Sequence, residues 1–63
     1  MRVLIGTTVQ NVEQVDMDCN MLILINDERI LYYVYIESLK ERKEIMDQLL
    51  KNGWADLRGY EFQ

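Results

Sequence analysis

The stretch of sequence that decides the fold runs from Asp16 to Asp27 and reads DMDCNMLILIND. Its acids fall at the first, third and twelfth positions of a calcium-binding loop, and Asn20 falls at the fifth. The sixth position of such a loop needs glycine for a sharp bend, and Met21 stands there instead. The apolar run that follows offers no side-chain ligand, so we reject the calcium site.

The alternation of apolar and polar residues in the same stretch predicts a β-strand. From Val15 to Met21 every second residue is apolar, which is typical of a strand with one buried face. Carboxylates two positions apart on a flat strand lie about 6.5–7 Å from each other, too far to share one ion without distortion. Cys19 falls in the apolar series, so we expect it to be a small buried hydrophobic residue.

Four strands and one helix are expected along the chain. The strands are predicted at residues 2–9, 14–25, 30–37 and 55–62, and the polar segment Asn26–Arg29 closes a hairpin between the second and the third. The expected fold is α+β, with a small antiparallel sheet and one helix packed on one face. The sheet is a three-strand meander plus a C-terminal strand, in the order β-β-β-α-β.

The helix is predicted from its two ends. Ser38 and Glu41 form a capping box at its start, and Asn52-Gly53 is a left-handed stop at its end. The expected buried stripe consists of Leu39, Met46, Leu49 and Leu50, with Ile45 on its flank.

Composition limits the classes of function. The chain of 63 residues predicts a single domain, residues 1–63, and its net charge of −4 argues against binding to nucleic acid phosphates. One cysteine and no histidine exclude an internal disulfide and a zinc site of the Cys/His type, and they fit a reducing, cytoplasmic setting. No signal peptide, membrane span, metal or cofactor is expected.

The predicted hairpin leaves one face of the sheet unusually apolar. With a loop of two or four residues, one side carries Cys19, Met21, Ile23, Ile25, Ile30, Tyr32, Val34 and Ile36, and this side is expected to meet the helix. The other side carries Leu22, Leu24, Leu31, Tyr33 and Tyr35, with Asp18, Asn20 and Glu37 at its rim. Apolar patches with aromatic centres and polar rims mark contact surfaces. The alternative is that the N-terminal segment or the Trp54–Phe62 tail covers this face, and Trp54 and Phe62 are themselves expected in the core.

Catalysis is not expected. The chain has no histidine to act as a base, no Cys-His or Ser-His arrangement and no glycine-rich phosphate loop. We therefore predict a non-catalytic protein-binding module that uses the Leu/Tyr face. The alternative is a homo-oligomeric structural or assembly subunit, such as a homodimer, whose copies meet through the same face.

A short acidic chain with a hairpin, one capped helix and a last strand resembles the small phage-encoded proteins that inhibit host or defence enzymes. The resemblance covers the layout of about residues 20–62, and it includes no shared motif, so no residue role is carried over. It implies that acids beside an apolar anchor imitate nucleic acid phosphates toward a basic groove. The candidates for this acidic edge are Asp16, Asp18, Asp27 and Glu28.

Overall fold

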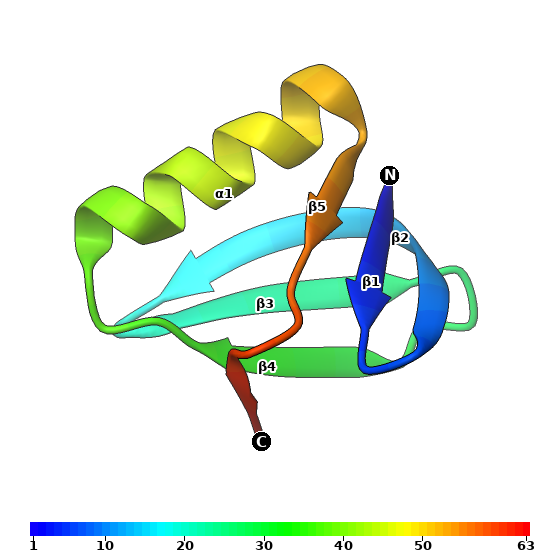
Figure 1. Ribbon diagram of the computed structural model, residues 1–63, viewed down its shortest axis with the longest axis horizontal. Coiled ribbons are helices and arrows are strands. Elements are labelled where there is room, and N and C mark those ends of the chain that lie inside the picture. Colours follow the sequence, from blue (N-terminus) through cyan, green and yellow to red (C-terminus); the bar gives the residue numbers. More distant parts are fainter.

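Six strands and one helix make up the computed structural model, which describes residues 1–63 (Figure 1). They are β1 (Arg2–Ile5), β2 (Thr8–Asp18), β3 (Met21–Asn26), β4 (Leu31–Tyr35), α1 (Leu39–Asn52), β5 (Trp54–Asp56) and β6 (Glu61–Phe62). The expected α+β class with one helix is confirmed. The expected order and strand count are wrong, because there are six strands instead of four and the β1–β5 pair is parallel, which makes the sheet mixed.

The first two predicted strands are each a hairpin. Residues 2–9 turn back at Gly6-Thr7, where Gly6 has a φ of +60°, a left-handed conformation that glycine adopts freely. Residues 14–25 turn back at Cys19-Asn20, with Asp18 paired to Met21. Cys19 is exposed at this tip and is not the buried residue that its place in the alternation predicted. The Cys19-Asn20 turn has only two residues and no glycine, so it hardly interrupts the alternating pattern. For this reason the sequence of residues 14–25 predicts one strand.

The last predicted strand is also two strands, and they lie at opposite edges of the sheet. The strand order is β5-β1-β2-β3-β4-β6, so residues 55–62 contribute both the first strand and the last. Five strand spacings in a flat sheet amount to about 24 Å. The connection from Asp56 to Glu61 can reach only about 18 Å when fully extended. The sheet must therefore curl, and Figure 1 shows β1 and β5 in front of the layer formed by β2, β3 and β4.

A β-bulge helps β2 to follow this curl. The pairing of β2 with β3 shifts between Val12 and Gln14, which leaves Glu13 as an extra residue. Val12 and Val15 are both buried although they lie three residues apart. A regular strand would point them to opposite faces, so the bulge is what keeps both side chains on the inner face.

The core lies between the inner face of the curled sheet and α1. It combines sheet residues with two residues of the helix and two of the C-terminal segment: Val3, Val12, Val15, Leu22, Leu24, Val34, Ile36, Ile45, Leu49, Ala55 and Leu57. Phe62 is half-buried against this cluster, in line with its expected core role. Trp54 is 38% exposed and does not belong to it.

The helix begins after Ser38 and stops at Gly53 as predicted, but only the Ser38 half of the capping box forms, since the Glu41 carboxylate accepts from Tyr60 instead. The buried stripe also differs from the predicted one. The Ser38 side chain accepts a hydrogen bond from the Glu41 backbone N–H at 3.2 Å, and Gly53 is the left-handed C-cap with a φ of +71°. The buried residues are Arg42, Ile45 and Leu49, whereas Leu39 and Leu50 are 51% and 62% exposed. The stripe that meets the sheet is therefore turned from the predicted one toward Arg42. The Arg42 Nη1 atom donates hydrogen bonds to the carbonyl oxygens of Ile36 and Glu37, which ties α1 to the end of β4.

The register of the β3–β4 hairpin reverses the predicted faces of β3 and leaves those of β4 as predicted. Its loop has five residues, Asn26–Ile30, since Ile25 pairs with Leu31. With five residues in the loop, Leu22 lies opposite Val34. With an even number of residues, Leu22 would instead lie opposite a residue of the Leu31, Tyr33 and Tyr35 series. A one-residue slip moves every side chain of a strand to the other side of the sheet. Leu22 and Leu24, which the sequence assigned to the exposed face, are completely buried.

Asn26 closes the five-residue loop. Its side-chain Oδ1 atom accepts hydrogen bonds from the backbone N–H groups of Glu28 at 2.9 Å and Ile30 at 2.8 Å. Its own N–H donates to the Ile30 carbonyl at 3.0 Å, and its carbonyl accepts from the Arg29 N–H at 3.0 Å. Arg29 adopts a left-handed φ of +66° inside this loop. Asn26 itself is buried, so its amide group organises the turn from within.

Candidate protein-binding surface

The outer face of the hairpin strands carries six apolar or aromatic side chains in adjacent rows. Cross-strand pairing places Met21 opposite Tyr35, Ile23 opposite Tyr33, and Ile25 opposite Leu31. We call this set the outer patch: Met21, Ile23, Ile25, Leu31, Tyr33 and Tyr35. Directly opposed side chains on one face lie about 4.5–5.5 Å apart at Cβ, so the three rows form one continuous surface.

The outer patch remains accessible to solvent. Leu31 and Tyr33 are 45% and 37% exposed, and the other four members are partly exposed. Neither the helix nor the C-terminal segment covers this face, because their apolar side chains pack against the inner face. The predicted alternative of cover by another part of the chain therefore applies to Leu22 and Leu24 but not to Leu31 and Tyr33.

Acidic side chains flank the outer patch on both sides. On β2, Asp18 pairs with Met21 and Asp16 pairs with Ile23, and on β6 Glu61 pairs with Tyr35. Asp16 accepts a hydrogen bond from the Gln14 side-chain amide at 3.0 Å, which holds its carboxylate on this face. The rows contain no lysine or arginine, so the surface combines an apolar centre with a rim of one charge sign.

The four acids predicted to form one edge fall into two separate pairs. Asp16 and Asp18 lie at one end of the β2–β3 hairpin, and Asp27 and Glu28 lie in the loop beyond the far end of β3. All four are exposed. The C-terminal part of β2 does lie at a strand edge, because β1 pairs only with residues Thr8–Asn11 of β2. Asp16 and Asp18 therefore belong to the outer patch and its rim, and the other pair does not share a row with it.

Sequence reasoning identified half of this surface. Leu31, Tyr33 and Tyr35 lie on the outer face as predicted, and Leu22 and Leu24 belong to the core. Met21, Ile23 and Ile25 were assigned to the helix side and in fact face outward. No local signal in the sequence identified them, because the odd loop length depends on hydrogen bonds of Asn26 that only the folded hairpin shows.

Two further contacts lie away from the outer patch. Arg58 donates side-chain and backbone hydrogen bonds to Asp56 and thereby lowers the pKa of that carboxyl from 3.8 to about 2. The Tyr60 hydroxyl donates to a carboxylate oxygen of Glu41, and this bond together with burial raises the pKa of Tyr60. Both contacts involve the segment that joins β5 to β6. The Tyr60–Glu41 bond ties this segment to α1, whereas the exposed Asp56–Arg58 pair spans only two residues.

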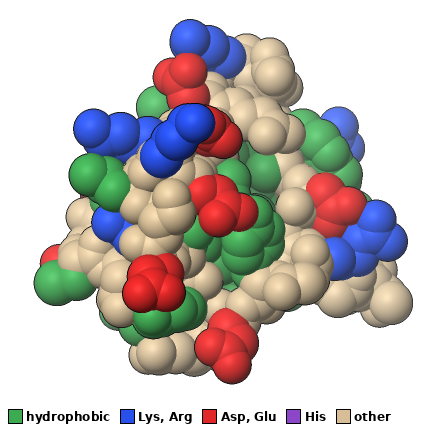
Figure 2. All heavy atoms as spheres, turned by 60° about the vertical axis from the view of Figure 1, so that its left-hand side comes forward, with side chains coloured by type: hydrophobic (Ala, Val, Ile, Leu, Met, Phe, Trp, Pro, Cys, Tyr) green, Lys and Arg blue, Asp and Glu red, His purple; other side chains and the backbone are tan.

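The surface around the beginning of α1 mixes both charge signs. Figure 2 looks at the molecule from the side that holds this end of the helix, and it shows hydrophobic side chains near the centre with acidic ones around them and basic ones toward the periphery. No group of three or more His, Cys, Asp or Glu side chains is arranged to hold a metal ion. The helix is too short and too polar to cross a bilayer.

Comparison with known proteins gives no relative on which to base a function. No protein-family model, no curated protein and no solved structure matches this chain. The outer patch is therefore interpreted from its own chemistry.

Proposed function

We propose that this chain is a non-catalytic protein-binding module that docks on another protein through the outer patch. The observation that carries the proposal is the exposure of Leu31 and Tyr33 on β4, in an apolar surface two of whose rows end in Asp16, Asp18 and Glu61. An antiparallel sheet with one solvated face normally shows polar residues on that face. Burying a large apolar side chain contributes about 1.5–3 kcal/mol, so a partner that covers these rows gains substantial free energy.

The rim determines the chemistry of the partner. Three carboxylates without a neighbouring base favour a partner surface that has lysine or arginine around apolar pockets. Pairing two outer patches with each other would instead bring carboxylates of both copies together, which disfavours self-association through this face. We therefore infer a partner with a basic groove, such as a host or defence enzyme that binds nucleic acid. In this account the acids occupy the place of phosphates and the chain inhibits the enzyme.

Affinity capture from the native host tests the proposal. The chain is used as bait at low and high salt, beside a variant with Leu31→Ser and Tyr33→Ser. Both residues are exposed, so the variant is expected to keep its far-UV spectrum while it loses the captured protein. Capture of the same protein by the folded variant would contradict the role of the outer patch.

The contribution of the acids is tested separately. Asp16→Asn with Asp18→Asn is expected to slow association and to flatten its dependence on salt, because rim charges act mainly on the association rate. Asp27→Asn with Glu28→Gln removes the same formal charge beyond the other end of β3 and serves as the matched control. Equal effects of the two double variants would point to net charge and not to a local rim.

Self-association through the outer patch is the competing function, in which the chain is a structural or assembly subunit. The solution mass of the Leu31→Ser, Tyr33→Ser variant separates the two. A wild-type dimer that becomes a monomer in this variant would favour the assembly subunit over the binder of a foreign protein.

A further inference from the structure

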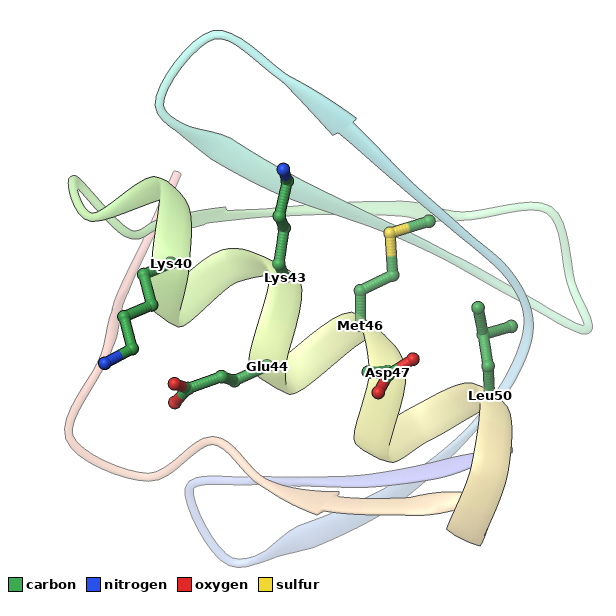
Figure 3. A pocket seen from close by; sticks show the side chains of 6 residues that line it. All are labelled: Lys40, Lys43, Glu44, Met46, Asp47 and Leu50. Carbon is green, nitrogen blue, oxygen red and sulfur yellow. The ribbon is translucent and has the colours of Figure 1, made fainter.

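The solvent side of α1 carries a second surface that the proposed function does not use. A shallow hollow of about 450 Å³ lies along the helix and is lined by Lys40, Lys43, Glu44, Met46, Asp47 and Leu50. Figure 3 shows Lys43, Met46 and Leu50 projecting to the same side of the helix. Leu39 and Leu50 are 51% and 62% exposed, and they are the most exposed leucines of the chain. The core thus leaves Leu39 and Leu50 unpaired in a stripe along α1, whereas Met46 between them is partly exposed and also packs against the core.

The stripe has the spacing of a helix–helix seam. Leu39, Lys43, Met46 and Leu50 follow one another at intervals of four, three and four residues, which is the alternation of d and a positions in a heptad. Lys43 occupies one a position, and a polar residue there selects a register at some cost in stability. Lys40 and Asp47 occupy the flanking e positions, where charges choose the partner and its direction.

The charges along the stripe are complementary to themselves in one direction only. The basic residues Lys40 and Lys43 come first, and the acidic residues Glu44 and Asp47 follow. In an antiparallel pair of these helices, Leu39 meets Leu50 of a second copy and Lys43 meets Met46. The same register brings Lys40 beside Asp47 of the second copy. A parallel pair in register would instead bring the two Lys43 side chains together at the seam and would leave Lys40 and Asp47 without each other.

We propose that a second copy of this chain covers the stripe, with the two α1 helices antiparallel about a two-fold axis. The contact is isologous, so the two apolar contacts at the ends and the two Lys40–Asp47 ion pairs arise from one set of residues. Asp47 already accepts an ion pair from Lys51 at 2.9 Å within its own helix, and its carboxylate can take a second donor. All four charged residues are exposed, so the seam can form without rearrangement of the core.

This dimer would leave the outer patch of each copy free. The core separates α1 from the outer face of β3 and β4, so the helix seam and the outer patch lie on different sides of the fold (Figure 1). A helix of 14 residues is about 21 Å long, and interfaces of that extent are small. We therefore expect a dimer that dissociates on dilution and that presents two binding surfaces when it is assembled.

Charge reversal tests the seam and its direction. One variant carries Lys40→Glu with Lys43→Glu, and another carries Glu44→Lys with Asp47→Lys. Each makes the stripe single-signed, so each alone is expected to lose self-association at least tenfold in sedimentation equilibrium. An equimolar mixture of the two is expected to recover a heterodimer at least as strong as the wild-type dimer. Melting curves of each variant show that loss of the dimer is not loss of the fold.

Two further variants separate this seam from the outer patch. Leu50→Ser is expected to weaken the dimer, and Tyr33→Ser is expected to leave it unchanged. A wild type that stays monomeric at the highest concentration overturns the proposal, as does a mixture that does not associate. Dissociation by Tyr33→Ser but not by Leu50→Ser would place the dimer contact on the outer patch and would equally overturn it.

Discussion

Leu22 lies directly opposite Val34 in the β3–β4 ladder, and both side chains are completely buried. Since side chains alternate between the two faces along a strand, the position of this pair determines the face on which every other residue of β3 and β4 lies. Because Leu22 and Val34 point into the core, Ile23 and Tyr33 in the next row must point outward. The outer patch therefore follows from the register of one hairpin.

The two faces are expected to respond differently to the same truncation. Leu22→Ala removes a buried side chain and should lower the free energy of unfolding by about 2–5 kcal/mol. Ile23→Ala changes the adjacent, partly exposed residue on the other face and should cost clearly less. Urea denaturation of both variants measures the difference, and equal losses would mean that the register is not the one described.

The stability of the loop between β3 and β4 should depend on one acceptor atom, Oδ1 of Asn26. Asn26→Ala leaves the N–H groups of Glu28 and Ile30 without their side-chain partner, at a cost of about 1–3 kcal/mol. Asn26→Asp keeps an acceptor oxygen in the same place and serves as the control. Thermal unfolding should show a marked fall for the alanine variant and a smaller one for aspartate. A loss of equal size in both would contradict the role assigned to the acceptor oxygen.

Glycine in place of Cys19 at the tip of the β2–β3 hairpin should raise the stability of the fold. Cys19 has a φ of +53°, a left-handed conformation that costs residues with a Cβ atom about 1–2 kcal/mol. Cys19→Gly is therefore expected to raise the melting temperature by a few degrees, whereas Cys19→Ala keeps the Cβ atom and should not. The gain should be visible by circular dichroism under reducing conditions. A lower midpoint for the glycine variant would show that the thiol makes a contact that outweighs this strain.

The hydrogen-bonded pair of Asp56 and Arg58 should be detectable when the carboxyl group of Asp56 is titrated with acid. The folded-state pKa of Asp56 is lowered to about 2 from 3.8, first by the side-chain hydrogen bonds from Arg58. The stability that this pair contributes is therefore present above pH 3.8 and is lost as the pH falls through about 2. The carboxyl chemical shift of Asp56 should have its midpoint near 2 in the wild type and should move toward 3.8 in Arg58→Gln. A midpoint that does not move would assign the shift to another group.

Local signals predicted the helix and failed for the hairpin register. The Ser38 cap and the Gly53 stop are encoded by residues within a few positions of the helix ends, so both were predictable. The register depends on whether the β3–β4 loop has an odd or an even number of residues. That number is set by hydrogen bonds of Asn26 and a left-handed Arg29, which propensities do not reveal. The alternation itself was correct, and its assignment to faces was reversed for β3 but right for β4.

Long-range pairing explains the other differences. β5 and β6 have three and two residues, and each forms only because the curled sheet brings a partner strand to it. A continuous pattern over residues 55–62 gives no sign that its two ends pair with β1 and β4. The buried position of Arg42 was missed for a different reason, since its partners are nearby main-chain carbonyl oxygens, which no pattern of side chains reveals. The predicted surface was consequently right about Leu31, Tyr33 and Tyr35 and wrong about Leu22 and Leu24.

The most direct test of the outer patch is the affinity of the captured partner for matched variants. The dissociation constant is measured by calorimetry for the wild type, for Leu31→Ser with Tyr33→Ser, and for Val9→Ser, which changes another exposed apolar residue outside the patch. The account predicts that the double variant binds at least a hundredfold more weakly with an unchanged fold, and that Val9→Ser binds like the wild type. Unchanged affinity in a folded double variant would contradict the central claim.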